Sequence, residues 1–154
     1  MIRIHHTHGD LSAHDQGAIN AGFTRHTAEV AAPPYKKERL NWLARDSSNS
    51  LVGAVTADLL WDWIYIDELW TAESHRGTGL GRRLMETAEE FATSRALTGI
   101  WLWTQSWQAA DFYRHLGYAE FARFDDFPRG HTRVGFRKMI RLDQTSNASR
   151  TPSS

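Results

Sequence analysis

The sequence contains no cysteine, and this absence removes a whole class of chemistry. Without thiols there is no disulfide, no zinc-cysteine site and no cysteine nucleophile, so any reaction must use oxygen or nitrogen groups. Neither sign of charge is in excess, because lysine plus arginine equals aspartate plus glutamate at 18 each. The chain therefore lacks the positive field that attracts nucleic acid or anionic lipid, and neither is expected as a partner.

Long apolar runs are missing as well. No segment approaches the roughly 20 consecutive apolar residues that a membrane helix requires. Residues 1–10 are polar and rich in histidine, unlike a signal peptide, which predicts a cytoplasmic location. We interpret His5, His6 and His8 as surface residues, since strand alternation separates His5 from His6 and no acidic partner completes a site. No metal is expected.

The 154 residues, of which 41% are hydrophobic, suffice for one hydrophobic core. We expect a single domain over residues 1–142. Residues 143–154 are polar and poor in apolar side chains, which predicts a disordered tail.

Periodic patterns of apolar residues predict alternating helices and strands. The predicted strands cover residues 3–5, 40–45, 51–60, 63–71, 100–105, 118–126 and 132–141. The predicted helices cover residues 12–27, 80–96 and a last stretch that Ser106 caps and that ends near Gly117. Strict alternation in the strand 63–71 puts Asp67 with Leu69 on one face and Glu68 with Trp70 on the other.

A glycine-rich loop, Arg76-Gly77-Thr78-Gly79-Leu80-Gly81, opens the helix that begins at residue 80. Its glycines let backbone amides converge, and the helix directs its positive end to the same place, so a pyrophosphate would fit there. The loop lacks the Gly-Lys-Ser/Thr of a P-loop, and its Gly-x-Gly-x-Gly spacing differs from the dinucleotide Gly-x-Gly-x-x-Gly. The alternative to a phosphate-binding loop is a helix start in which the glycines serve only tight packing.

Two motifs together resemble one family. Arg76-x-x-Gly79-x-Gly81 resembles the acetyl-CoA signature of GNAT N-acetyltransferases, and residues 109–118 resemble the Ala-x-x-x-Tyr-x-x-x-Gly-Phe/Tyr segment of the same superfamily. The resemblance covers roughly residues 40–140 and implies an α/β (α+β) GNAT fold. That fold has a mixed sheet of about seven strands, mostly antiparallel, with one parallel pair splayed at the acetyl-CoA site and about four helices on both faces.

The resemblance also implies that acetyl-CoA is the co-substrate. Backbone amides at the end of the strand 63–71 would face its thioester, and the loop would surround its pyrophosphate. Many members carry Asn near the position of Ser106, where it contacts the pantetheine arm, and Ser106 with Gln105 reproduces this contact only in part. The cofactor-binding residues so implied are Leu69, Trp70, Thr71, Arg76, Gly77, Thr78, Gly79, Leu80, Gly81, Arg82, Ser106 and Phe112.

Acetyl transfer to an amine needs a base for the ammonium, donors for the oxyanion and an acid for the thiolate. Tyr113 matches the family spacing, and a phenol of pKa about 10 can protonate a thiolate of pKa about 8.5. The structural alternative is a tyrosine packed in the core. Glu68 is the first candidate for the base, with Asp67 and Asp58 as substitutes. The structural alternative for Glu68 is a strand carboxylate that is exposed or forms a salt bridge. Without cysteine, direct transfer in a ternary complex is expected.

These features predict an N-acetyltransferase that moves an acetyl group to a primary amine of a small molecule. Aromatic side chains near Tyr35, Trp61 and Phe127 could enclose such an acceptor. Two alternatives are left open, namely acetylation of a peptide or protein amine, and a catalytically silent acyl-CoA-binding regulatory domain. A homodimer is also left open.

Overall fold

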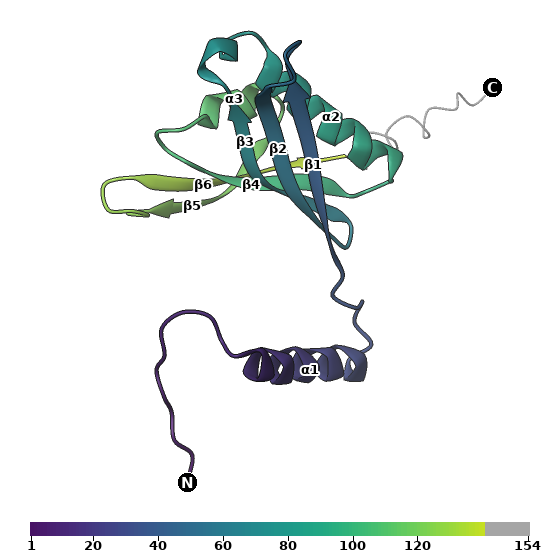
Figure 1. Ribbon diagram of the computed structural model, residues 1–154, viewed down its shortest axis with the longest axis vertical. Coiled ribbons are helices and arrows are strands. Elements are labelled where there is room, and N and C mark those ends of the chain that lie inside the picture. Colours follow the sequence, from purple (N-terminus) through teal and green to yellow (C-terminus); the bar gives the residue numbers. More distant parts are fainter. Residues whose placement is uncertain (141–154) are drawn as a thin grey trace, which may run out of the picture. The chain divides into compact units, whose positions relative to one another are not determined.

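A computed structural model describes residues 1–140, which belong to two compact units (Figure 1). The first unit is residues 1–36 and the second begins at Lys37. The predicted tail over residues 143–154, and Arg141 at the end of the last predicted strand, lie outside the described residues. The single domain over residues 1–142 stays a prediction.

The first unit contains one helix, α1 (Ala13–Glu29), close to the predicted range of 12–27. Ser12 caps it, because the Ser12 Oγ accepts a hydrogen bond of 3.0 Å from the Asp15 backbone N–H. The strand predicted at residues 3–5 is wrong, since no strand forms there. A three-residue run without a paired neighbour gains no ladder of hydrogen bonds, and the local pattern of Arg3 to His5 alone does not supply one.

The second unit is built on a six-stranded mixed sheet, in the order β1-β2-β3-β4-β6-β5. All neighbouring strands are antiparallel except the parallel pair β3 and β4. The predicted mixed, mostly antiparallel sheet is confirmed, with six strands in place of about seven because residues 3–5 do not contribute. The strands are β1 (Lys37–Arg45), β2 (Leu51–Leu60), β3 (Trp63–Thr71), β4 (Gly99–Gln105), β5 (Ala119–Asp125) and β6 (Thr132–Met139).

Two helices, α2 (Leu80–Ser94) and α3 (Ala110–His115), pack on this sheet, and a short 3₁₀ turn, η1 (Glu73–His75), precedes α2. The buried side of α2 and Tyr113 of α3 belong to one continuous core with the even-numbered residues of β4, such as Leu102. Both helices therefore lie on the same face, whereas helices on both faces were expected. The apolar stripe of α2 contains Leu84, Met85, Ala88 and Ala92, all buried.

A bulge in β3 changes which side chains share a face. Thr56 pairs with Glu68 and Ala57 pairs with Ile66, which leaves Asp67 as the extra residue. Beyond the bulge Leu69 packs on the core, while Asp67 contacts Arg39 on the opposite face. The prediction from strict alternation that Asp67 and Leu69 share a face is therefore wrong.

Gly99 begins β4 at a point where no side chain fits. A Cβ atom there would lie 2.6 Å from the Lys138 carbonyl oxygen and 2.7 Å from the Trp63 ring. Because the carbonyl belongs to a paired strand, we expect Gly99→Ala to lower the free energy of unfolding by about 1–3 kcal/mol in urea titrations. Gly17→Ala in α1 is the control, because a Cβ at Gly17 meets nothing within 4 Å. Equal stability of the two variants would contradict this packing.

Candidate active site

The predicted phosphate loop forms a tight turn between η1 and α2. Gly77 and Gly79 have φ angles of 72° and 84°, in the left-handed region that favours glycine. Gly79 is the N-cap of α2 and provides no side-chain cap. The Thr78 hydroxyl donates a hydrogen bond of 2.6 Å to the His75 carbonyl and closes the turn. The backbone amides at the start of α2 are therefore left without side-chain acceptors.

These amides form a continuous row of donors. Within residues 1–140 the N–H groups of residues 77–82 make no hydrogen bond of good geometry. The first helical bond runs from Arg83 N–H to the Gly79 carbonyl at 3.1 Å. They lie at the positive end of a helix of 15 residues, with the cationic side chains of Arg76 and Arg82 on the same segment. The turn has the donors and the charge to hold a pyrophosphate.

Three of the predicted cofactor-binding residues come together beside this turn. A Cβ atom on Gly81 would lie 3.5 Å from the Phe112 ring and 3.8 Å from the Thr71 methyl carbon. The end of β3, the start of α2 and the start of α3 therefore meet. Leu80 is directed elsewhere and covers Gly53, where a Cβ atom would lie 3.0 Å from the Leu80 side chain.

The parallel strands separate at the same place. Pairing between β3 and β4 runs from Trp63 with Gly99 to Ile66 with Leu102 and then stops. Residues 69–71 continue to pair with β2 on one edge, while their other edge has no partner in β4. The splayed parallel pair predicted from the sequence is confirmed, and it leaves backbone groups of β3 available next to the glycine turn.

Ser106 has a different role from the predicted helix cap. Its Oγ accepts a hydrogen bond of 3.1 Å from Thr132 N–H, and its own N–H donates to the Thr132 carbonyl at 2.7 Å. It therefore joins the end of β4 to the start of β6, and α3 begins at Ala110 without a side-chain cap. The Gln105 Oε1 atom nearby is buried and has no hydrogen-bond partner among the described residues.

Gln108 is a structural residue that no motif in the sequence predicts. Its Oε1 accepts hydrogen bonds from Gln105 N–H at 2.9 Å and from the Thr104 hydroxyl at 3.2 Å. It therefore fixes the turn after β4. The only local signal is a glutamine three residues beyond the strand, which is too common to be informative alone.

Tyr113 is buried at the centre of α3, with 7% of its surface exposed. Its ring contacts Phe112, Tyr118 and Phe136, at centroid distances of 5.2, 5.9 and 6.0 Å. Burial raises the pKa of the phenol to about 12, so the group holds its proton at neutral pH. Its hydroxyl makes no hydrogen bond to any described residue, which leaves the proton free for a ligand.

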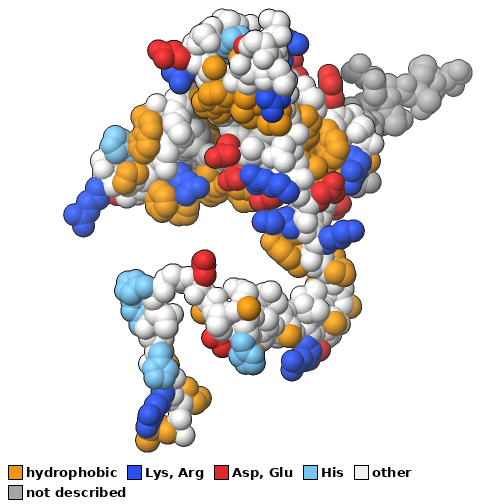
Figure 2. Space-filling model, in the orientation of Figure 1, with side chains coloured by type: hydrophobic (Ala, Val, Ile, Leu, Met, Phe, Trp, Pro, Cys, Tyr) orange, Lys and Arg blue, Asp and Glu red, His pale blue; other side chains and the backbone are white. Residues whose placement is uncertain are grey.

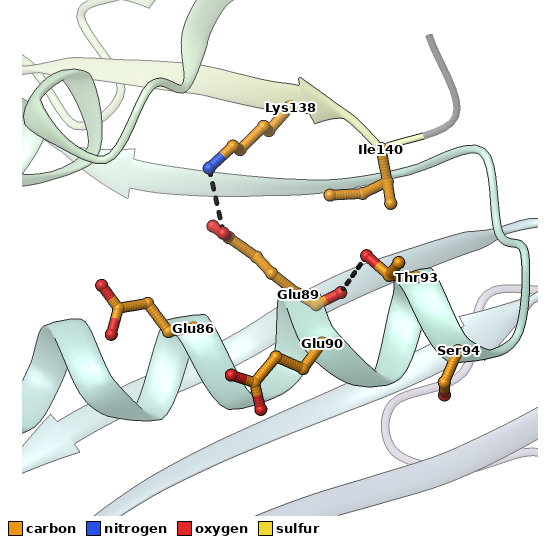
Figure 3. Close-up of a pocket in the computed structure, with 7 residues that line it drawn as sticks. All are labelled: Glu86, Glu89, Glu90, Thr93, Ser94, Lys138 and Ile140. Carbon is orange, nitrogen blue, oxygen red and sulfur yellow. Dashed lines mark hydrogen bonds and ion pairs between the residues drawn. The ribbon is translucent and has the colours of Figure 1, made fainter. Parts of the chain in front are cut away.

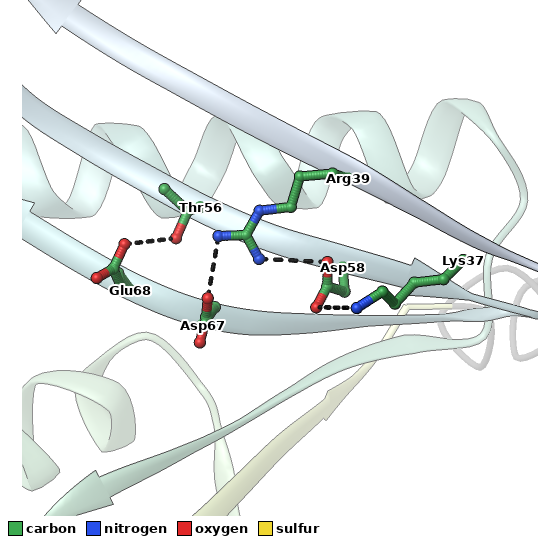
Figure 4. A network of polar contacts seen from close by, with 6 residues as sticks. All are labelled: Lys37, Arg39, Thr56, Asp58, Asp67 and Glu68. Carbon is green, nitrogen blue, oxygen red and sulfur yellow. Dashed lines mark hydrogen bonds and ion pairs between the residues drawn. The ribbon is translucent and has the colours of Figure 1, made fainter. Parts of the chain in front are cut away.

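Glu68 differs from its two substitute carboxylates in its contacts (Figure 4). The Glu68 carboxylate accepts a hydrogen bond of 3.0 Å from the Thr56 hydroxyl and has no ion pair within residues 1–140. Arg39 donates to Asp67 at 3.0 Å and to Asp58 at 3.2 Å, and Asp67 followed by Asp58 raises the pKa of Arg39. Two of the three candidate bases are therefore neutralised, and Glu68 is not.

The sheet face that carries Glu68 also carries aromatic rings. Tyr65 lies 4.6 Å from Trp101, and Trp103 stacks on Phe124 at 5.3 Å, between ring centroids. Figure 2 shows acidic and basic side chains gathered between hydrophobic ones on the second unit. The sequence did not predict this grouping, because the register of four strands brings these residues together.

Comparison with known proteins identifies the family. Residues 16–118 match the acetyltransferase (GNAT) family, and the chain belongs to it. It is 36% identical over 83 residues to the blasticidin-S acetyltransferase of Streptomyces morookaense. That match covers 53% of this chain and 61% of the relative, so the chain spans about three fifths of that protein's length.

Solved structures confirm the predicted GNAT fold. An acetyltransferase from Bacillus cereus ATCC 14579 is 25% identical with a TM-score of 0.73, covering 86% of this chain and 97% of that one. A Bacillus anthracis acetyltransferase in complex with acetyl coenzyme A is 20% identical with a TM-score of 0.59, covering 70% and 64%. Within residues 1–140 no helix is long and apolar enough to cross a membrane, and no group of three potential metal ligands occurs.

Proposed function

We propose that the chain is an acetyl-CoA-dependent N-acetyltransferase that moves an acetyl group to a primary amine of a small molecule. The observation that carries the proposal is the row of unbonded amides over residues 77–82, next to the unpaired edge of β3. Family membership and the acetyl coenzyme A bound to the Bacillus anthracis protein support the co-substrate. The Streptomyces relative, named for blasticidin-S, supports a small acceptor.

The residues present fit acetyl-CoA, which supplies an activated acyl thioester when bound. The amides of residues 77–82, with Arg76, would hold the pyrophosphate. The amides of residues 69–71 would face the thioester carbonyl. Phe112 and the unsatisfied oxygen of Gln105 are the groups suited to the pantetheine arm, because one is apolar and the other lacks a donor.

The reaction proposed is direct transfer in a ternary complex. Glu68 accepts one proton of the acceptor ammonium, and the neutral amine then forms the C–N bond with the acetyl carbon as the C–S bond breaks. The second proton of the nitrogen passes to the departing thiolate, which leaves as the thiol of CoA. Amides of residues 69–71 stabilise the oxyanion, and Tyr113 faces the departing sulfur. The pKa of Tyr113, about 12, exceeds the roughly 8.5 of a thiol, so a hydrogen bond to the sulfur is favoured over complete proton transfer.

The role of Glu68 is tested by the pH dependence of turnover rather than by a loss of rate alone. Glu68→Gln keeps the size of the side chain but accepts no proton, so turnover should fall by up to about 10²-fold near pH 7. Much of the loss should return toward pH 10, where the free amine is abundant because its own pKa is about 10. The measurement is turnover from about pH 6 to pH 10, alongside melting curves.

Asp67→Asn is the matched control, because Asp67 is the neighbouring carboxylate and pairs with Arg39. We expect it to leave the shape of the pH profile unchanged. A Glu68→Gln variant whose turnover follows the wild type at every pH would remove Glu68 from the mechanism. If turnover is instead lost near pH 7 and recovers at high pH in Asp67→Asn, Asp67 is the base.

The class of acceptor is tested by a thiol-release screen with acetyl-CoA, small amines and peptides. Release with small amines and none with peptides supports the proposal. Release only with peptides would change the acceptor to a protein amine. Tight acetyl-CoA binding without release would indicate a silent acyl-CoA-binding domain.

A further inference from the structure

A hydrogen-bonded network joins α2, β6 and the C-terminal end of α3. We call Glu89, Lys138, Tyr118 and the Leu116 carbonyl the Glu89 network. Lys138 Nζ donates to the Glu89 carboxylate at 2.9 Å and to the Leu116 carbonyl at 2.9 Å, and the Tyr118 hydroxyl donates to Glu89 at 3.1 Å. Figure 3 shows the contact between Lys138 and Glu89 across the hollow beside α2.

The two charges are largely removed from water. The Lys138 and Glu89 side chains are 27% and 16% exposed. At this depth a charge-assisted hydrogen bond is strong, and removal of one partner leaves the other charge poorly compensated. The Glu89 network therefore restrains the groups that it contacts much more than an exposed ion pair would.

The restrained groups belong to the segment that ends α3. Tyr118 N–H donates to the Tyr113 carbonyl at 3.0 Å, and Gly117 N–H donates to the Arg114 carbonyl at 3.0 Å, which is a Schellman motif. Gly117 has the positive φ of 88° that this motif requires. The backbone of Tyr113 is thus bonded to Tyr118, whose side chain is bonded to Glu89.

The other end of α3 offers little restraint. The helix has six residues, and its N-cap, Ala109, makes no side-chain hydrogen bond. A helix this short is not stable by itself, so its position depends on its tertiary contacts. The Tyr113 ring packs edge-on against Tyr118 at 5.9 Å, which places the phenol next to the residue that the Glu89 network holds.

We propose that Lys138 and Glu89 are positioning residues that orient Tyr113 through Leu116 and Tyr118. This inference rests on the proposed function for Tyr113 and adds the groups that set its geometry. Neither residue contacts the glycine turn, because both lie beside the second half of α2 and the end of β6. Their effect should therefore fall on turnover rather than on acetyl-CoA binding.

The test replaces Lys138 with methionine, which keeps the length of the side chain and removes the charge. Turnover should fall roughly 10-fold with the KM for acetyl-CoA unchanged. In a Tyr113→Phe background the same change should have less than about a 2-fold effect, because the group that it orients is gone. Arg95→Met, which removes an exposed cation at the C-terminal end of α2, is the control and should leave turnover unchanged.

A second readout does not depend on activity. Hydrogen exchange at the Gly117 and Tyr118 amides should become about 10-fold faster in Lys138→Met, with the amides in the middle of α2 unchanged. If Lys138→Met fails to fold, Glu89→Gln provides the same comparisons with a smaller change. Unchanged exchange at both amides would overturn the inference. This readout requires no acetyl transfer, so it tests the inference even where the proposed function fails. Equal losses of turnover with and without the Tyr113 hydroxyl would also overturn it.

Discussion

Tyr113→Phe should lower turnover roughly 10²–10⁴-fold while leaving the affinity for acetyl-CoA almost unchanged. The phenol acts as the C–S bond breaks, through its hydrogen bond to the departing sulfur, so its loss affects the transition state more than the bound substrate. The phenol is suited to this role, because burial holds its pKa at about 12 and the group keeps its proton at the pH of the assay. Steady-state kinetics with a small-amine acceptor measures both quantities.

The same variant should be as stable as the wild type. The Tyr113 hydroxyl bonds to nothing in the described part of the chain, so its removal leaves no unsatisfied partner. Tyr118→Phe gives the contrast, because it removes the hydrogen bond to Glu89 and should lower the melting temperature. Normal turnover in Tyr113→Phe would show that Tyr113 is a packing residue and that water or another group serves the thiolate.

Gly79→Val should reduce the affinity for acetyl-CoA by about 10²-fold or more. A Cβ atom at Gly79 meets nothing of the protein within 4 Å, so the valine side chain would occupy the space beside the free amides. That space is the proposed site of the pyrophosphate. The φ of 84° is also strained for a β-branched residue, which would misdirect the amides. Calorimetric titration with acetyl-CoA measures the loss.

Gly130→Val is the matched control for backbone strain. Gly130 has a φ of 78°, and a Cβ atom there also meets nothing within 4 Å, but it lies in the hairpin between β5 and β6. We expect both variants to lose a similar amount of stability, and only Gly79→Val to lose acetyl-CoA affinity. Unchanged affinity in a folded Gly79→Val variant would refute the assignment of the turn.

The sequence predicted the parts of the fold that local patterns determine. Helix α2 and strand β3 begin at the predicted residues, Leu80 and Trp63, because a glycine turn and a run of apolar residues mark them. The glycine turn is predicted from its glycines at residues 77, 79 and 81 together with its place between a strand and a helix. The strand at residues 3–5 failed because strand formation depends on a partner that a local pattern does not contain.

The contacts that distinguish the candidate catalytic residues depend on strand register. Arg39 reaches Asp58 and Asp67 because β1, β2 and β3 lie side by side with a bulge at Asp67. One extra residue in β3 decided which carboxylates share a face. The partnership of Lys138 with Glu89 spans 49 residues of sequence and likewise has no local signal. The residues of the turn therefore have a local signal in the sequence, while the contacts that support the proposed site have none.

Direct transfer of an acetyl group from acetyl-CoA to a small amine can be followed in one experiment that observes the amine, CoA and the protein together. Purified protein is mixed with acetyl-CoA and the best amine from the screen, and mass spectrometry follows the amine and the intact protein together. We expect acetylated amine to appear in the same amount as free CoA, with the protein unmodified throughout. Free CoA without acetylated amine, or an acetylated protein that forms first and then decays into product, would contradict direct transfer to the amine.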